Sequence, residues 1–119
     1  MRVMVIVKAT KDSEAGVMPP ADLIERMGAY NHALIDAGLF IDAGGLKASG
    51  AGARVSIAGE NCAATRGPFD DVGKLASGYW LWKVKDLDEA IDWAKRCPTS
   101  SSGPFELEIR PLFEMEDFA

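Results

Sequence analysis

The chain of 119 residues is 48% hydrophobic and carries 13 basic against 18 acidic residues, with a pI near 4.8. This length favours one compact domain over residues 1–119, and the acidic balance argues against nucleic acid or an anionic membrane surface as a partner. The apolar run at the start of the chain is broken at Lys8, short of the ~20 residues that a membrane helix needs, so we expect a cytoplasmic protein.

The first part of the chain predicts a strand followed by a long helix. Residues 2–8 form a short apolar run rich in β-branched side chains, which is typical of a buried strand. The helix is expected to begin after Pro20 and to run to about Ala37, because Gly38 is the residue type that commonly follows a helix. Its apolar stripe at 3.6-residue spacing consists of Leu23, Ile24, Met27, Tyr30, Asn31, Leu34 and Ile35.

The rest of the chain predicts further strands and a second helix. Residues 39–43 and 53–58 are predicted strands joined by a glycine-rich loop, and residues 75–84 form another strand that is rich in aromatic side chains. Asp86 has the position of a helix N-cap, and Pro98 ends that helix. The apolar positions expected to be buried are Leu87, Ala90, Ile91 and Ala94 in the helix, and Phe105, Leu107 and Ile109 in an alternating last strand.

The order of these elements predicts a ferredoxin-like α+β sandwich, in which an antiparallel sheet carries two helices on one face. The other face of such a sheet must be solvated or covered by a partner. Trp80, Trp82 and Val84 share one face of their strand, and this face is too apolar to be left in water. We therefore expect a homodimer that forms through the open sheet face.

Five short motifs occur in a fixed order over nearly the whole chain. They are Gly45-Leu46-Lys47-Ala48-Ser49, Arg66-Gly67-Pro68-Phe69, Gly78-Tyr79-Trp80, residues 88–94, and Glu108-Ile109-Arg110-Pro111. In this order the motifs resemble the DGPF branch of the YCII-related superfamily, and the resemblance implies a dimeric α+β barrel. The chain departs from that family in one charged turn. Arg66 stands where an aspartate is usual, Asp71 where a glutamate is usual, and Gly73-Lys74 where a Lys-Glu pair is usual.

The Gly67-Pro68 turn leaves two interpretations open. It can be a rigid turn that aims the acidic residues up to Asp71, with Phe69 in the core, because proline fixes its own φ and glycine frees the backbone before it. It can also form one wall of a ligand cleft, in which Arg66 binds an anion through its forked donors. Arg66 and Asp71 are therefore candidate ligand-binding residues.

The strongest polar candidates lie on the last strand. Glu108 and Arg110 project from one face and match the family's Glu-x-Arg-Pro signature. They form either an exposed ion pair of little energetic weight or part of a pocket between the open sheet face and the dimer partner. In that pocket Arg110 would hold an anionic group and Glu108 would orient it or act as a base. Tyr79, opposite Trp80 on its strand, either packs in the core or donates its hydroxyl to a ligand.

The chain has one histidine and two cysteines. His32 lies away from the apolar stripe and can pair on the helix surface with Asp36, four residues further on. In some more distant YCII relatives that resemble enzymes, a catalytic histidine is on the first helix, at the position that Met27 takes here, so the resemblance does not support a His–Asp dyad in this chain. Cys62 and Cys97 match no metal-ligand spacing and are expected to be reduced, ordinary thiols. We expect neither a metal nor a cofactor.

Two functions from different classes follow from these features. The first is a small-molecule-binding dimer, a cofactor-free lyase or isomerase that acts on a small anionic or aromatic compound. The second is a non-catalytic binding or interaction module with a regulatory role, which the altered charged turn favours. Turnover of a bound ligand would favour the first, and an unchanged ligand or a protein partner would favour the second.

Overall fold

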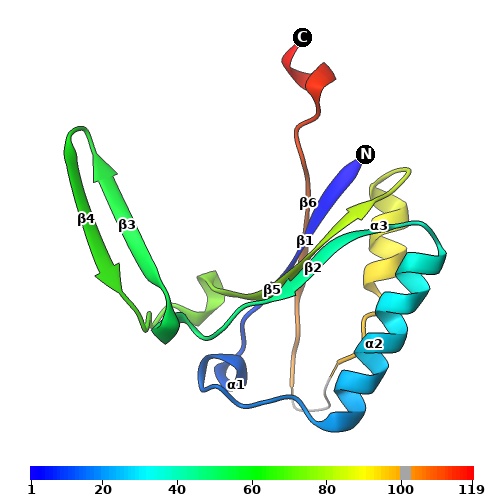
Figure 1. Ribbon diagram of the computed structural model, residues 1–119, viewed down its shortest axis with the longest axis horizontal. Coiled ribbons are helices and arrows are strands. Elements are labelled where there is room, and N and C mark those ends of the chain that lie inside the picture. The colour runs from blue at the N-terminus through cyan, green and yellow to red at the C-terminus, as the bar shows by residue number, and fades with distance from the viewer. Residues whose placement is uncertain (100–102) are drawn as a thin grey trace.

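The computed structural model describes residues 1–99 and 103–119 as a mixed α+β structure (Figure 1). Its strands are β1 (Arg2–Lys8), β2 (Phe40–Gly45), β3 (Ala53–Ala58), β4 (Asn61–Arg66), β5 (Ala76–Lys83) and β6 (Leu107–Pro111). Its helices are α1 (Lys11–Glu14), α2 (Ala21–Asp36) and α3 (Leu87–Ala94), with 3₁₀ turns η1 (Ser49–Ala51), η2 (Val72–Lys74) and η3 (Met115–Phe118). Four strands form an antiparallel sheet in the order β2-β5-β1-β6. The predicted ferredoxin-like α+β fold is confirmed.

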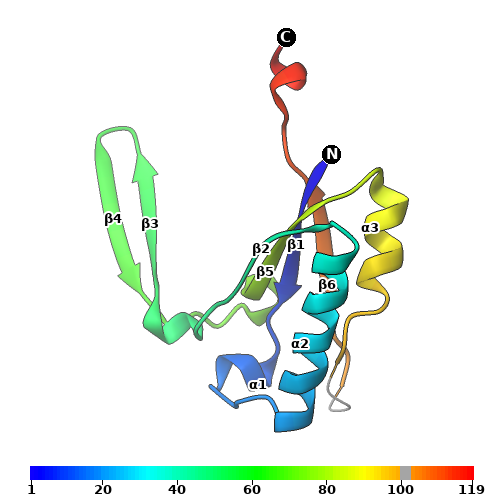
Figure 2. The ribbon, with the colours of Figure 1, turned by 45° about the vertical axis from the view of Figure 1, so that its right-hand side comes forward.

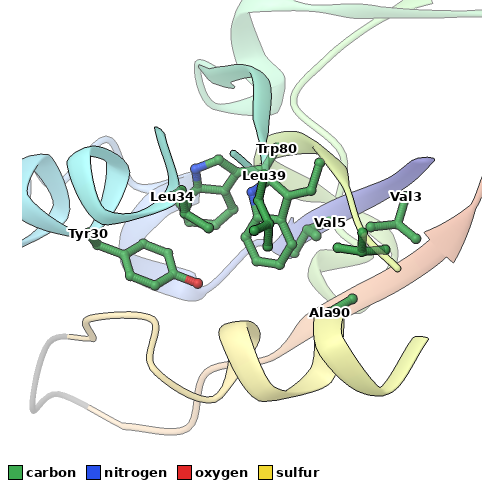
Figure 3. Packing of buried hydrophobic residues seen from close by; sticks show 9 residues of the cluster. Val3, Val5, Tyr30, Leu34, Leu39, Trp80 and Ala90 are labelled. Atoms are coloured by element: carbon green, nitrogen blue, oxygen red, sulfur yellow. The ribbon is translucent and has the colours of Figure 1, made fainter. Parts of the chain in front are cut away.

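Helices α2 and α3 cover the same face of this sheet, and the hydrophobic core lies between them and the strands (Figures 2 and 3). Successive side chains of a strand point to opposite faces, so alternate residues of β1 and β5 reach the helices. On the helix side, Tyr30 and Leu34 of α2 and Ala90 of α3 are buried. The full set of buried apolar residues is Val3, Val5, Tyr30, Leu34, Leu39, Trp80, Trp82, Val84 and Ala90.

The tryptophan-bearing face of β5 is therefore covered by the chain's own helices. Trp80, Trp82 and Val84 are each exposed by 4% or less. The argument that these side chains need a partner to cover them was wrong, because a two-residue period does not tell which face of a strand receives the helices. The dimeric barrel stays a prediction and needs a different surface. The open face, which points away from the helices, carries the apolar residues Met4 and Ile6 of β1 and Leu81 of β5.

The helix ends follow their capping residues. The Asp86 carboxylate accepts a hydrogen bond from the Glu89 backbone N–H at 2.9 Å, and Gly38 takes a φ of 79° after α2. The expected burial of Leu87 was wrong: it is 42% exposed, because the short α3 is fully buried only in its middle turn, at Ala90. Three other residues of the predicted apolar set are also exposed. They are Ile24 and Ile35, at the two margins of the α2 stripe, and Phe105, before β6.

Within the described residues, no helix is long and apolar enough to cross a membrane.

Strands β3 and β4 form a hairpin over residues 53–66, here called the arm, which projects from the rest of the molecule (Figure 1). The sequence predicted β3 correctly but missed β4, whose Ala63-Ala64 pair has little strand propensity. Every residue of the two strands is exposed. Val55 and Ile57, on one face of the arm, are 62% and 71% exposed.

Candidate functional site

The helix-facing side chains of the sheet shrink in size from one end of the strands to the other. Taken across β2, β5 and β1, the rows are Phe40-Trp82-Val3, Ala43-Trp80-Val5 and Gly45-Gly78-Val7. The two glycines of the last row have no side chain to fill the space toward α2. Gly78 is confined by its neighbours, because a Cβ atom there would lie 3.0 Å from the Gly44 carbonyl oxygen. Gly45 has nothing within 4 Å of a Cβ atom.

This shortage of side chains opens a cleft of about 1180 Å³ at the glycine end of the sheet. One wall is formed by Leu23, Met27 and Asn31, which lie four residues apart on the same side of α2. Met18 and Phe105, from segments distant in the sequence, are also among the lining residues. A largely apolar concavity of at least several hundred Å³ with a few polar groups is the usual form of a small-molecule site.

One of the uncharged polar residues that line the cleft is Asn31, whose side chain is fixed by the core. Its Oδ1 atom accepts a hydrogen bond from the Trp80 Nε1–H at 2.8 Å. The Trp80 ring packs edge-on against Tyr30, with ring centroids 5.7 Å apart. Tyr30 in turn donates its hydroxyl to the Trp93 carbonyl oxygen at 2.6 Å, and burial raises the pKa of this phenol far above its ordinary value. A closely packed, hydrogen-bonded aromatic cluster therefore holds the amide in place.

Charged groups at the cleft are few. The charged residues in the lining are Lys8, Lys47 and Asp12. A lysine ammonium can attract an anionic ligand, and a carboxylate or an amine can transfer a proton if its pKa suits the reaction. The cleft can thus bind a small apolar or aromatic framework that carries polar or anionic substituents.

The Arg66-Gly67-Pro68-Phe69 turn is not among the residues that line the cleft and lies beside it. A Cβ atom on Gly67 would overlap the Ser49 carbonyl oxygen and lie 2.6 Å from its carbonyl carbon. The Phe69 backbone N–H donates to Ser49 Oγ at 2.9 Å, and the Ser49 hydroxyl and backbone N–H both donate to the Glu14 carboxylate. Glycine at this position therefore allows the turn to dock against η1 and α1.

Two of the predicted ligand contacts belong to this turn. Asp71 is paired with Arg54 at 3.1 Å, and hydrogen bonding to that guanidinium lowers the pKa of the Asp71 carboxyl. Arg54 also lies 3.9 Å above the centre of the Phe69 ring. The expectation that Phe69 fills the core was wrong, because its ring packs under a surface arginine. Arg66 is exposed at the end of β4, and its predicted role as an anion-binding group stays a prediction.

The other predicted contacts, Tyr79, Glu108 and Arg110, belong to the open side of the sheet. Tyr79 lies opposite Trp80 as predicted, but because Trp80 faces the helices, Tyr79 faces the open side and not the core. Arg110 Nη1 and Glu108 Oε2 are 3.4 Å apart, with the Arg110 side chain 70% exposed. Tyr79 contributes to the cleft lining, but its hydroxyl donates to Asp42 Oδ2 at 3.2 Å, and this hydrogen bond raises the Tyr79 pKa. Of the five predicted site residues, Tyr79 is the one that the cleft lining includes. The ligand-binding roles of Glu108 and Arg110 stay predictions for a different surface.

His32 and the two cysteines take no part in the cleft lining. His32 is exposed on α2, and both Cys62 and Cys97 are free thiols, as predicted. Burial raises the pKa of Cys97 to about 11. Among residues 1–99 and 103–119, no group of three or more histidine, cysteine, aspartate and glutamate side chains is arranged to hold a metal ion.

Sequence reasoning missed the residues that define this cleft. Asn31 was assigned to the apolar stripe of α2 without a function, although an amide among leucines and methionines is itself a signal of a polar task. Gly45 and Gly78 were noticed as motif residues. Their joint effect depends on strand pairing, which brings together residues 33 positions apart.

The fold and the cleft can now be compared with known proteins. The profile of the YCII-related domain family matches residues 1–116. The chain therefore belongs to the YCII-related family, while its placement in the DGPF branch stays a prediction. No curated protein gave a match.

One similar solved structure is 5-chloro-2-hydroxyhydroquinone dehydrochlorinase (TftG) from Burkholderia phenoliruptrix AC1100, in complex with 2,5-dihydroxybenzoquinone. The two chains are 14% identical, the match covers 98% of each, and the TM-score is 0.54. At this identity the likeness establishes a shared fold.

Proposed function

We propose that this protein binds a small aromatic or quinoid compound in the cleft, and that it acts on this compound as a cofactor-free lyase or isomerase. The observation that carries the proposal is the cleft itself, which is largely apolar and has a fixed amide and two lysines in its lining. Membership of the YCII-related family supports a small-molecule role. The similar fold that holds 2,5-dihydroxybenzoquinone suggests the first compound to test.

The charged residues of the cleft lining that can take part in proton transfer are Asp12, Lys8 and Lys47. An isomerase acting on a phenol or enol moves a proton between carbon and oxygen, whereas a lyase removes a proton as a substituent leaves the ring with its bonding electrons. Both need a base near the ring and a stabilising donor near the oxygen. The ammonium groups and the Asn31 amide can supply the second requirement. We therefore propose that the chemistry takes place in the cleft rather than at Arg66, Asp71, Glu108 or Arg110.

Filling the cleft tests the proposal. Gly45→Phe places a ring at a position where a Cβ atom meets nothing within 4 Å, so the variant should fold and block the cleft. Gly45→Ala, with one methyl group, is the matched control and should bind as the wild type does. A ligand at 100 times its dissociation constant should stabilise the protein by about 2.7 kcal/mol, which a thermal-shift assay resolves. Equal stabilisation of Gly45→Phe by 2,5-dihydroxybenzoquinone would show that the cleft is not the site.

Turnover is tested separately from binding. The wild-type protein is incubated with each compound that binds, and the products are followed by absorbance and mass spectrometry. Conversion that Gly45→Phe lacks and Gly45→Ala retains would establish an enzyme. Binding without conversion would favour the alternative function, a non-catalytic binding module with a regulatory role.

We also propose that the protein works as a homodimer in which a second copy covers the arm and the open sheet face. An isolated two-stranded hairpin is barely stable in water, yet the arm exposes Val55 and Ile57. From strand spacings, one arm face is about 200 Å² and the open sheet face about 300 Å². Two arm faces and two sheet faces together bury about 1,000 Å², which is about the area that a biological interface needs.

Sedimentation at micromolar concentration tests the homodimer. The wild type should sediment as a dimer, and Ile57→Asp should shift it toward a monomer because a carboxylate would be buried. Ser56→Asp, on the opposite face of the arm, is the matched control. A monomeric wild type would overturn the dimer, and the exposed arm would then favour a different protein partner.

A further inference from the structure

We propose that the Asn31 side-chain amide is the ligand-selecting donor of the cleft, and that it selects compounds with a carbonyl or phenolate oxygen on a small ring. This inference rests on the proposed function, because it assigns the ligand class to the same cleft. It follows from one hydrogen bond in the core and from the chemistry of the two groups that make it.

The orientation of the amide is set by its partner. An indole Nε1–H can donate a hydrogen bond but cannot accept one. Since Trp80 Nε1 lies 2.8 Å from the Asn31 side chain, the atom facing it must be the amide oxygen. The amide nitrogen, with two N–H groups, is therefore turned away from Trp80. Among the residues that the structure describes, no group accepts a hydrogen bond from this nitrogen.

The amide cannot easily turn over to offer its oxygen instead. A flipped amide would place its NH₂ group against the Trp80 N–H, so two donors would meet in a half-buried place. Nor can Trp80 move away, because the residue is 4% exposed and its ring packs at 80° against the Tyr30 ring. A donor held in position before the ligand arrives loses little entropy on binding, which increases its contribution to affinity.

The surroundings of the amide define the ligand. Met27 and Leu23 lie beside Asn31 along α2 and also line the cleft, so they favour an apolar ring. A carbonyl oxygen on that ring can accept from the amide nitrogen. A phenolate or enolate oxygen accepts more strongly, because hydrogen bonds to ionised groups are roughly twice as strong as neutral ones. Lys8 and Lys47 in the same lining favour the ionised form.

A matched pair of probes separates this role from general binding. Acetophenone and ethylbenzene have similar shapes, but only acetophenone has an acceptor oxygen. Their dissociation constants are measured by NMR titration for the wild type, Asn31→Asp and Asn31→Leu. Aspartate keeps an oxygen for Trp80 and removes both donors, whereas leucine removes the polar group. We expect the preference for acetophenone over ethylbenzene to fall about tenfold in both variants, with ethylbenzene affinity unchanged.

The side-chain resonances give a second, direct readout. The Asn31 NH₂ signals should shift when acetophenone is added and stay in place with ethylbenzene, while the indole N–H of Trp80 stays in place with both. An unchanged preference in both variants would overturn the inference and leave the proposed function intact. Loss of both probes in the variants, with the Trp80 signal displaced, would assign Asn31 a structural role and overturn it too. A wild type that binds neither probe nor dihydroxybenzoquinone would overturn the proposed function and this inference together.

Discussion

Replacing Gly67 with alanine tests whether the turn at residues 66–69 is held by its close approach to η1. The added Cβ would lie 2.6 Å from the Ser49 carbonyl carbon, whereas real Cβ contacts essentially never fall under 3.0 Å. Because the Ser49 carbonyl oxygen is also overlapped, the two segments must separate by roughly 1 Å. Such a movement stretches the 2.9 Å bond from the Phe69 N–H to Ser49 Oγ beyond hydrogen-bonding range.

The cost follows from the bonds that this movement loosens. A neutral hydrogen bond contributes about 1 kcal/mol net, and a bond to a charged group such as Glu14 about 1.5–3 kcal/mol. Losing the Phe69 bond and weakening those from Ser49 to Glu14 should destabilise the protein by about 2–4 kcal/mol. For a chain of this size, about 4 °C per kcal/mol gives a Tm lowered by about 8–16 °C.

Thermal unfolding followed by circular dichroism measures the change, with Gly73→Ala as the control. A Cβ atom on Gly73 meets nothing within 4 Å, so that variant should stay within about 1 °C of the wild type. If the turn opens locally, the global Tm moves less, but the Phe69 amide should lose protection from hydrogen exchange. An unchanged Tm together with full protection at Phe69 would refute the argument.

Three further outcomes are expected. The Asp71 pKa is lowered by Arg54 when folded, so this pairing stabilises the protein above about pH 3.8 and is lost as the pH falls through the lower, folded pKa. Urea unfolding of the wild type and Arg54→Ala should therefore differ less at pH 2.5 than at pH 7, and a constant difference would contradict the pairing. The exposed Cys62 thiol should react with a disulfide reagent at pH 8 much faster than the Cys97 thiol, because burial raises the Cys97 pKa to about 11 and the thiolate is the reactive form. Equal reaction rates would contradict the burial of Cys97. Gly28→Ala should raise the stability of α2 by about 1 kcal/mol in urea, since a Cβ atom there meets nothing within 4 Å, whereas a loss would reveal a hidden contact.

Most elements of the fold, though not β4, were readable from the sequence because each has a local cause. Asp86 opens α3 and Gly38 follows α2, as the capping rules predict. The side of the sheet that the helices cover has no local cause. Both faces of β5 carry large apolar residues, with Trp80 and Trp82 on one and Leu81 on the other, so periodicity alone could not choose between them.

The site was harder to predict because it is made by absent side chains. Gly45 and Gly78 look like ordinary turn or bulge residues when each is taken alone. Only the pairing of β2 with β5 puts them in one row and leaves the space open. The charged residues that attracted attention are on the surface, where Arg110 pairs with Glu108. A charge is visible in a sequence, but a missing side chain matters only in a particular three-dimensional setting.

The other buried tryptophan strengthens the case that Asn31 serves the cleft rather than the core. Within the described residues, the Trp82 Nε1–H is buried without a hydrogen-bond partner, which costs about 1–3 kcal/mol. The core therefore tolerates an unsatisfied indole, and Trp80 did not require an amide at position 31 for the fold to persist. A leucine there would continue the apolar stripe of α2. What the asparagine adds, and a leucine cannot, is a pair of N–H donors turned away from Trp80.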